Sequence, residues 1–215
     1  MDVDASGLLN QIKMLKGLFN KKHNINHEEQ ILEWERNGKR SPTPHIVKQN
    51  AIKQYQNKYG LEIFVETGTY LGEMVEAQKN NFKRIFSIEL SKKLSGKAVR
   101  KFRGFPQIKI IYGDSSIELN SIVPHLEQPA LFWLDGHYSE GITAMGEKEC
   151  PVVEELMIIL KSNFPHVILI DDARMFNGTH DYPTIHQINS IISNAGILYN
   201  IEVKDDIIRL IPNPK

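Results

Sequence analysis

Residues 64–72 and 85–90 decide the fold of this chain, and they have the sequences FVETGTYLG and IFSIEL. Each segment contains an apolar run typical of a buried strand, and a glycine turn followed by a helix-length segment separates the two runs. Gly68 lets the backbone approach a ligand closely, Gly72 lets the next helix pack on the sheet, and Glu89 is placed to accept both hydrogens of a ribose diol. The two segments therefore predict the first half of a nucleoside-binding α/β fold.

The glycine turn differs from the dinucleotide-binding fingerprint G-x-G-x-x-G. Thr69 and Tyr70 follow Gly68, and the next glycine is Gly72. The second glycine, which allows close approach to a pyrophosphate, is therefore missing. A purely structural interpretation also remains open, because any tight turn from strand to helix favours glycine.

Composition predicts one soluble domain with an N-terminal extension. The 215 residues are 41% apolar, which allows a single substantial core. Lys and Arg together number 26, as do Asp and Glu, so no overall positive field favours a nucleic-acid partner. The acidic start has no long apolar run, so we expect neither a signal peptide nor a membrane segment and expect the cytoplasm as the compartment.

The only cysteine, Cys150, excludes an internal disulfide and a zinc site of several thiolates. Cys150 is either a reactive thiol beside a loop of the active site or an inert small residue, and we favour the inert interpretation.

Helical patterns precede the first strand. Apolar residues recur at helical spacing over residues 8–19, which indicates a core or subunit contact and so a possible homo-oligomer. A second helix is expected over 27–37, and a third begins after Thr43 and ends before Gly60. The loop 38–43 is the expected boundary, with a helical extension over 1–43 and one domain over 44–215.

From residue 61 onward, strands and helices alternate, which is typical of right-handed βαβ units on a parallel sheet. Two runs near the end, 197–203 and 207–211, flank a short polar turn and predict an antiparallel hairpin. We therefore predict a Rossmann-like, doubly wound, mostly parallel sheet of seven strands that ends in this hairpin. Five parallel strands are expected near 62–66, 84–89, 107–112, 130–135 and 166–171.

Acidic residues follow the predicted strands where ligands of open α/β sheets bind. We expect Glu66 to hold one end of a nucleoside cofactor, Glu89 its ribose, and Asp114 with Ser115 its base. Ser115 is also a good N-cap, so a structural role is equally open. The other cofactor-binding candidates in the turn and after the fourth strand are Thr67, Gly68, Thr69, Gly72 and Asp135.

A second group of acids follows the fourth and fifth strands. Because these strands are neighbours about 4.8 Å apart in such folds, Asp135, Asp171 and Asp172 form a plausible all-oxygen site for Mg²⁺. In the alternative, Asp171 and Asp172 cap the loop and pair with Arg174, while Asp135 binds a cofactor amine.

His137 follows Asp135 by two residues and is the natural general base, since its ordinary pKa of about 6.5 suits proton removal near neutral pH. A plain hydrogen-bonding role for His137 in the loop is the alternative. Gly141 and Gly146 indicate a mobile loop, and Lys148 is a further candidate for substrate contact.

Four segments together resemble the class I methyltransferases that use S-adenosylmethionine (SAM): 64–72, 113–115, 131–139 and 169–174. The resemblance covers about residues 45–212. The arrangement is also similar to metal-dependent O-methyltransferases acting on catechols and on sugars of natural products. Carried over, it implies Asp135, Asp171 and Asp172 as Mg²⁺ ligands and His137 and Asp135 as catalytic residues. Thr69 replaces a glycine common in the first motif.

The resemblance implies O-methylation of a small hydroxylated acceptor such as a sugar or glycan precursor, with SAM as cofactor. Assistance by Mg²⁺ is left open. Two alternatives remain. One is a SAM- or nucleoside-binding module without chemistry, and the other is a metal-independent methyltransferase acting on nitrogen or a carboxylate.

Overall fold

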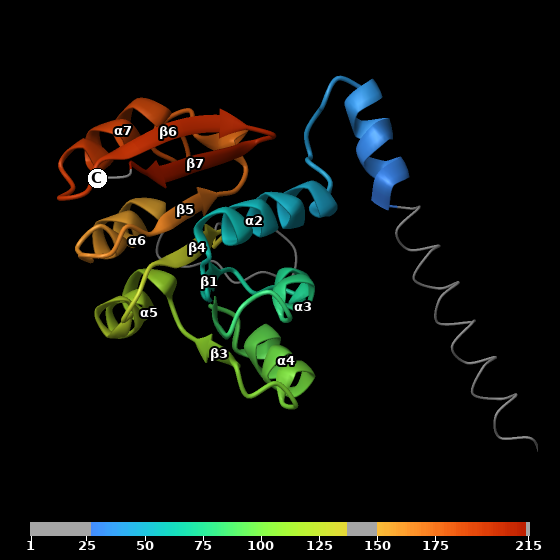
Figure 1. The fold of residues 1–215 in the computed structure, drawn as a ribbon, viewed down its shortest axis with the longest axis vertical. Helices are drawn as coiled ribbons and strands as arrows, with labels where there is room; N and C mark the ends of the chain where they lie inside the picture. Colours follow the sequence, from blue (N-terminus) through green and yellow to red (C-terminus); the bar gives the residue numbers. More distant parts are fainter. Residues whose placement is uncertain (1–26, 137–149, 214–215) are drawn as a thin grey trace, which may run out of the picture. The chain divides into compact units, whose positions relative to one another are not determined.

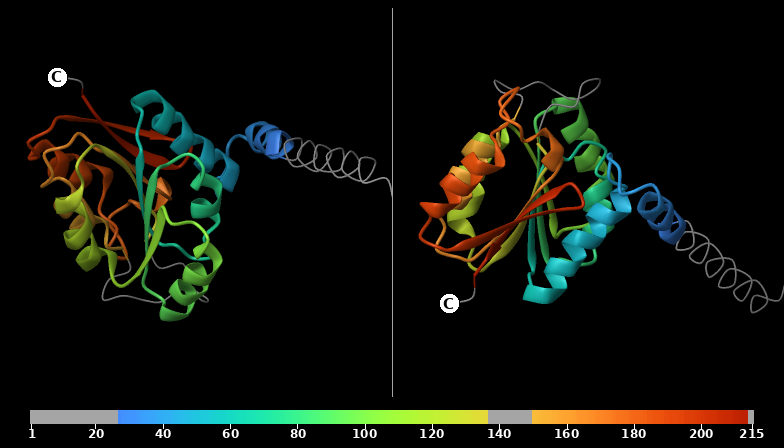
Figure 2. Two further views of the ribbon diagram at one scale, coloured as in Figure 1. Left: turned by 60° about the horizontal axis from the view of Figure 1, so that its bottom comes forward. Right: turned by 90° about the horizontal axis from the view of Figure 1, so that it is seen from above.

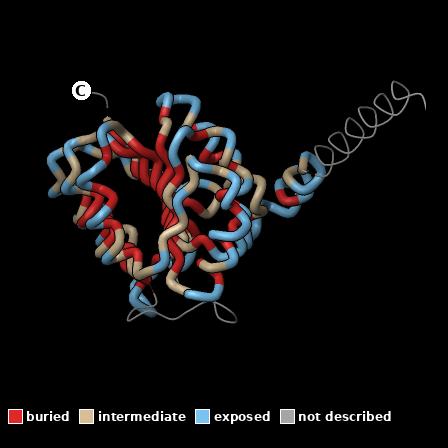
Figure 3. Tube along the Cα trace, turned by 90° about the horizontal axis from the view of Figure 1, so that it is seen from below, coloured by how far each residue is buried: buried red, intermediate tan, exposed pale blue. Residues whose placement is uncertain are grey.

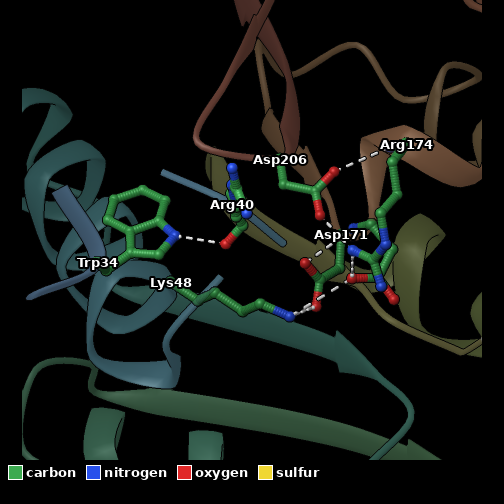
Figure 4. Close-up of polar contacts among 7 residues, drawn as sticks. Trp34, Arg40, Lys48, Asp171, Arg174 and Asp206 are labelled. Carbon is green, nitrogen blue, oxygen red and sulfur yellow. Dashed lines mark hydrogen bonds and ion pairs between the residues drawn. The ribbon is translucent and has the colours of Figure 1, made fainter. Parts of the chain in front are cut away.

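The computed structural model describes residues 27–136 and 150–213. The chain divides into two compact units, Met1–Val47 and Lys48–Lys215. In the described part of the first unit, residues 27–36 form a helix, and Trp34 Nε1 donates a hydrogen bond of 2.8 Å to the carbonyl of Arg40 after it (Figure 4). The predicted helix over 8–19 lies outside the described residues, and the predicted division after residue 43 stays a prediction.

The second unit contains a mixed sheet whose described strands have the order β3-β2-β1-β4-β5-β7-β6 (Figure 1). The first five strands are parallel, and β7 runs antiparallel to both β5 and β6. The strands are β1 (Ile63–Thr67), β2 (Arg84–Glu89), β3 (Ile108–Tyr112), β4 (Ala130–Leu134), β5 (Val167–Ile170), β6 (Tyr199–Lys204) and β7 (Ile207–Pro212). The predicted parallel sheet with a terminal antiparallel hairpin is thus confirmed.

Helices connect the parallel strands as predicted, and further helices precede β1 and lead into the terminal hairpin. The main ones are α2 (His45–Tyr59), α3 (Glu73–Gln78), α4 (Lys92–Phe102), α5 (Ser115–Ile122), α6 (Val152–Ile159) and α7 (Ile185–Ser193). Two short 3₁₀ turns complete the connections, η1 (Val123–His125) and η2 (Ala173–Met175).

Alternate residues of each central strand enter different cores, one on each face of the sheet. Helices cover both faces, and the sheet between them is largely buried (Figures 2 and 3). Val65 and Phe132 pack with α5, α6 and α7, whereas Phe64 and Trp133 pack with α2, α3 and α4. Strands buried on both faces explain the continuous apolar runs of the sequence. The central strands are thus covered on both faces, and their carboxyl ends lie at one edge of the sheet.

The hairpin turn between β6 and β7 is made by Asp205 and Asp206, whose φ angles are +55° and +59°. Two consecutive residues with positive φ are typical of the turn type that matches strand twist, and aspartate tolerates this region better than most residues. No helix among the described residues is long and apolar enough to cross a membrane.

Candidate active site

The direction of the chain connections reverses at β1, which pairs with β2 on one side and with β4 on the other. In open α/β sheets this reversal opens a crevice outside the carboxyl ends of the strands. Glu66 and Thr67 end β1, Glu89 ends β2, and Asp135 follows β4. The structure therefore brings these predicted residues to the same edge of the sheet.

The Gly68 turn is closed by contacts within the protein backbone. The Gly68 N–H donates to the carbonyl of Ile88 over 2.9 Å, and the Gly68 φ angle is +84°. A Cβ atom on Gly68 would lie 2.2 Å from the carbonyl oxygen of Asp135. The requirement for glycine here therefore comes from the residue after β4, and a ligand contact by Gly68 stays a prediction.

Gly72 faces a neighbouring helix, whereas the sequence predicts that it lets the next helix pack on the sheet. It precedes α3 with a φ angle of +69°, and an added Cβ would lie 2.8 Å from the ring of Phe102 in α4. The requirement for glycine at this position therefore comes from the neighbouring helix and from the left-handed backbone together.

The Glu89 carboxylate holds the two loops beside the crevice. Its Oε2 atom accepts the Tyr70 N–H over 2.7 Å, and its Oε1 atom accepts the Ser91 N–H over 2.8 Å. Burial raises the pKa of Glu89, and the two backbone donors oppose that rise. Each carboxylate oxygen has a second lone pair, so the same side chain can also accept hydrogen bonds from a ligand.

Glu66 is linked to the glycine turn by a buried polar chain. Ser87 donates to Glu66 Oε2, and the hydroxyls of Ser87 and Thr69 lie 2.6 Å apart. Burial raises the pKa of Glu66 well above its ordinary value; the Ser87 hydrogen bond lowers it, and the charges of Asp135 and Glu89 raise it further. A cationic ligand near Glu66 would favour its ionised form.

Thr67 stands beside this chain, on the strand position after Glu66. The Oγ1 atom of Thr67 is buried, and no hydrogen-bond partner for it exists among the residues that the structure describes.

Asp114 caps α5: its Oδ1 atom accepts hydrogen bonds from Ser116 N over 2.8 Å and from Ser116 Oγ over 2.6 Å. Ser115 is the first residue of the helix and is buried. The N-cap is therefore Asp114 and not Ser115, because the Asp114 carboxylate accepts the backbone N–H of Ser116. A base contact by either residue stays a prediction.

A lysine enters the acid group after β4 and β5 (Figure 4). Lys48, near the start of α2, hydrogen-bonds Asp171 Oδ2 with its Nζ atom, which also lies 3.6 Å from Asp172 Oδ1. Burial alone would lower the pKa of the Lys48 ammonium, but the charges of Asp171, Asp135 and Asp172 raise it above its ordinary value. The lysine is therefore a cation in this group of carboxylates.

Arg174 adds a second cation from the other side. Its NH1 atom donates to Asp172 Oδ1 over 2.8 Å and also pairs with Asp206 of the β6–β7 turn. The alternative in which Arg174 pairs with Asp172 thus agrees with the structure.

Carboxylate oxygens are the ligands that Mg²⁺ prefers, but in this structure two of them are bound to basic side chains. Asp171 Oδ2 and Asp172 Oδ1 are bound to Lys48 and Arg174, and no group of three or more His, Cys, Asp or Glu side chains within 27–136 and 150–213 is arranged to hold a metal ion. The residues as placed do not fit a divalent cation, and metal binding by Asp135, Asp171 and Asp172 stays a prediction.

His137, Gly141, Gly146 and Lys148 lie outside the described residues, so the predicted base and its loop stay predictions. Cys150, at the end of that loop, is buried, and burial raises the pKa of its thiol to about 12. That environment favours the inert interpretation of the cysteine.

Lys48 is the residue that the sequence analysis missed. The helix that precedes β1 must run antiparallel to it, so the first turn of that helix lies at the same edge as the strand ends. A lysine in this turn, opposite acids after neighbouring strands, is a signal that could have identified it.

Strand order, antiparallel hairpin and glycine turn are together those of the class I SAM-dependent methyltransferase fold. No protein-family model and no curated protein matches the sequence significantly.

Solved structures, however, are similar to this chain. An O-methyltransferase from Streptomyces achromogenes involved in tomaymycin synthesis, solved with SAM, is 12% identical over 78% of this chain and 81% of its own, with a TM-score of 0.56. A putative caffeoyl-CoA O-methyltransferase from Staphylococcus aureus is 14% identical over 91% and 100%, with a TM-score of 0.55. A putative rRNA methylase from Clostridium thermocellum is 9% identical over 76% and 95%, with a TM-score of 0.56. At these identities the likeness establishes the fold.

Proposed function

We propose that this chain is a SAM-dependent methyltransferase. The observation that carries the proposal is the group of acids around the Gly68 turn, where Glu66, Glu89 and Asp135 end or follow three adjacent strands. SAM is a nucleoside with a sulfonium and an ammonium group, and both cations suit such a group of acids. The similar structure solved with SAM is consistent with this choice.

The first turn of α3 argues against a dinucleotide. In dinucleotide-binding folds the pyrophosphate lies at the N-terminus of the helix after β1. Here that turn carries Glu73 and Glu76, whose charges would repel a pyrophosphate. An acidic first turn does not disfavour SAM, which has no phosphate.

We assign the cofactor to the residues around the crevice. In this assignment Glu66 holds the methionine end, Glu89 accepts the ribose hydroxyls, and Asp114 with Ser115 faces the adenine. Asp135 binds the cofactor amine. The remaining contacts come from the turn residues Thr67, Gly68, Thr69 and Gly72.

The acceptor in our proposal is a small hydroxylated molecule, such as a sugar or glycan precursor. Its hydroxyl proton goes to His137 while the oxygen attacks the methyl carbon, the carbon–sulfur bond breaks, and S-adenosylhomocysteine leaves as a neutral thioether. The similar structures include small-molecule and rRNA enzymes, so they leave the acceptor class open. The zero net charge of the chain disfavours RNA.

The Mg²⁺-assisted form of this reaction needs Lys48 to leave the carboxylates that it binds. The metal-independent alternative is favoured by that contact. A SAM-binding module without chemistry is the second candidate, because the residues that we assign to the cofactor do not depend on the proposed base His137.

The test is transfer of a labelled methyl group from SAM to a panel of sugars, catechols, amines and carboxylic acids, with and without EDTA. We expect S-adenosylhomocysteine to form with a hydroxylated acceptor, and His137→Ala to reduce turnover by about 10²–10⁴ while SAM affinity is retained. Transfer only to amines or carboxylates would contradict O-methylation of a hydroxyl and favour the alternative, a methyltransferase acting on nitrogen or a carboxylate. Full activity of the His137→Ala variant would show that His137 is not the general base.

A further inference from the structure

Lys48 and Asp171 meet across 123 positions of sequence. Lys48 lies near the start of α2, and Asp171 directly follows β5. The Asp171 side chain is 1% exposed and that of Lys48 is 15% exposed. Two residues of the same compact unit, an ammonium and a buried carboxylate, therefore meet at the carboxyl edge of the sheet (Figure 4).

A cation at this place has an evident physical reason. Asp171 also binds its own neighbour, since Oδ1 accepts the Asp172 N–H over 2.8 Å. Its other oxygen, Oδ2, contacts the Lys48 ammonium. An ionised buried carboxylate without an opposite charge is costly, and Lys48 supplies that charge.

A divalent ion would need the same oxygen atoms. Mg²⁺ and Mn²⁺ bind carboxylate oxygens at about 2.0–2.2 Å, and an ammonium already in contact with Asp171 Oδ2 and 3.6 Å from Asp172 Oδ1 would be repelled by the ion. Lysine and metal therefore compete for one position.

We propose that Lys48 is the resident cation of the carboxylate group Asp135, Asp171 and Asp172, and that it excludes a divalent metal ion from it. In the methyltransferase proposed above, on which this role rests, Lys48 is a positioning residue: it fixes Asp171 and supplies the positive charge beside the acceptor side of the crevice.

Mn²⁺ binding to the full chain, followed by electron paramagnetic resonance of the free ion, tests this directly and needs no acceptor. The variants are Lys48→Ala, Lys48→Gln and Lys48→Arg. Lys48→Gln keeps a hydrogen-bond donor for Asp171 without the charge, and it replaces Lys48→Ala if the latter does not fold. The matched control is Lys53→Ala, an exposed lysine of the same helix.

We expect Lys48→Ala and Lys48→Gln to bind Mn²⁺ at least about tenfold more tightly than the unmodified chain, because one positive charge is removed from among several carboxylates. Lys48→Arg and Lys53→Ala should bind as weakly as the unmodified chain. Adding Asp172→Asn to Lys48→Ala should abolish the gain.

Equal Mn²⁺ affinity of the unmodified chain and Lys48→Ala, whether tight or undetectable, would overturn the proposal. Calorimetric titration with SAM on the same samples separates this outcome from failure of the proposed function. Absence of SAM binding would contradict the proposed function. The comparison of Mn²⁺ affinities would still decide whether Lys48 is the resident cation.

Discussion

Gly68 and Asp135 touch through their backbones where the sheet connections reverse, since a Cβ atom on Gly68 would lie 2.2 Å from the Asp135 carbonyl oxygen. The turn after β1 is thereby fixed against the end of β4. The two segments that frame the candidate cofactor site cannot separate without loss of this contact.

Gly68→Ala should lower the free energy of unfolding by about 2–4 kcal/mol, because it combines overlap with a backbone atom and a positive φ angle. Gly104→Ala is the matched control, since an added Cβ there meets nothing within 4 Å. Urea denaturation of both variants measures the difference. A Gly68→Ala variant as stable as Gly104→Ala would show that the turn is not closed in this way.

Glu89→Ala should weaken SAM binding by about 1–3 kcal/mol, because hydrogen bonds to a charged group are lost. The substitution also removes the acceptor of the Tyr70 and Ser91 N–H groups. Part of the loss of affinity should therefore come from weaker anchoring of the loops that contain these two residues. Calorimetric titration gives the affinity, with Glu127→Ala, an exposed residue far along the chain, as the control. Unchanged affinity in Glu89→Ala would remove Glu89 from the cofactor site.

The stability of the domain should depend on pH through His166. Its Nδ1 atom accepts the Ala130 N–H over 3.0 Å, its Nε2 atom lies 2.8 Å from Ser162 Oγ, and burial lowers its pKa to about 4. The unfolded chain binds a proton at a pKa of about 6.5, so stability conferred by the neutral ring is present above pH 6.5 and is lost as the pH falls toward 4.

His166→Asn keeps an acceptor for Ala130 and does not titrate. Urea unfolding of the unmodified chain should show a loss of about 2 kcal/mol between pH 7 and pH 5 from this group, and the variant should lack that part of the loss. Identical pH dependence of the two proteins would contradict the buried neutral ring.

Cys150 should react with a disulfide reagent only when the domain unfolds. The thiolate is the reactive form, and burial raises the pKa of this thiol to about 12. Stopped-flow labelling in native buffer and in urea gives the two rates. Labelling of the native protein as fast as that of the unfolded chain would mean that the thiol is exposed and active.

Much of this fold follows from the sequence because its signals are local. The apolar runs around Val65 and Phe132 are continuous since those strands are buried on both faces, and the two aspartates at 205 and 206 mark the hairpin turn. The acids at the strand ends are predictable for the same reason, because parallel strands end at one edge of the sheet.

The candidate site is less predictable because its contacts join distant segments. Lys48 and Asp171 are 123 positions apart and are connected only through the direction of the helix before β1. Nothing near Gly68 in the sequence indicates the carbonyl of Asp135. Both contacts depend on how α2 and β4 are placed on the sheet, which periodicity does not specify.

Calorimetric titration of the full chain with SAM and, separately, with NAD tests the central claim most directly. An acidic crevice with two glutamates in the first turn of α3 predicts micromolar binding of SAM and negligible binding of NAD. NAD binding as tight as that of SAM, or no binding of SAM, would contradict the assignment of this crevice to a methyl-donor cofactor.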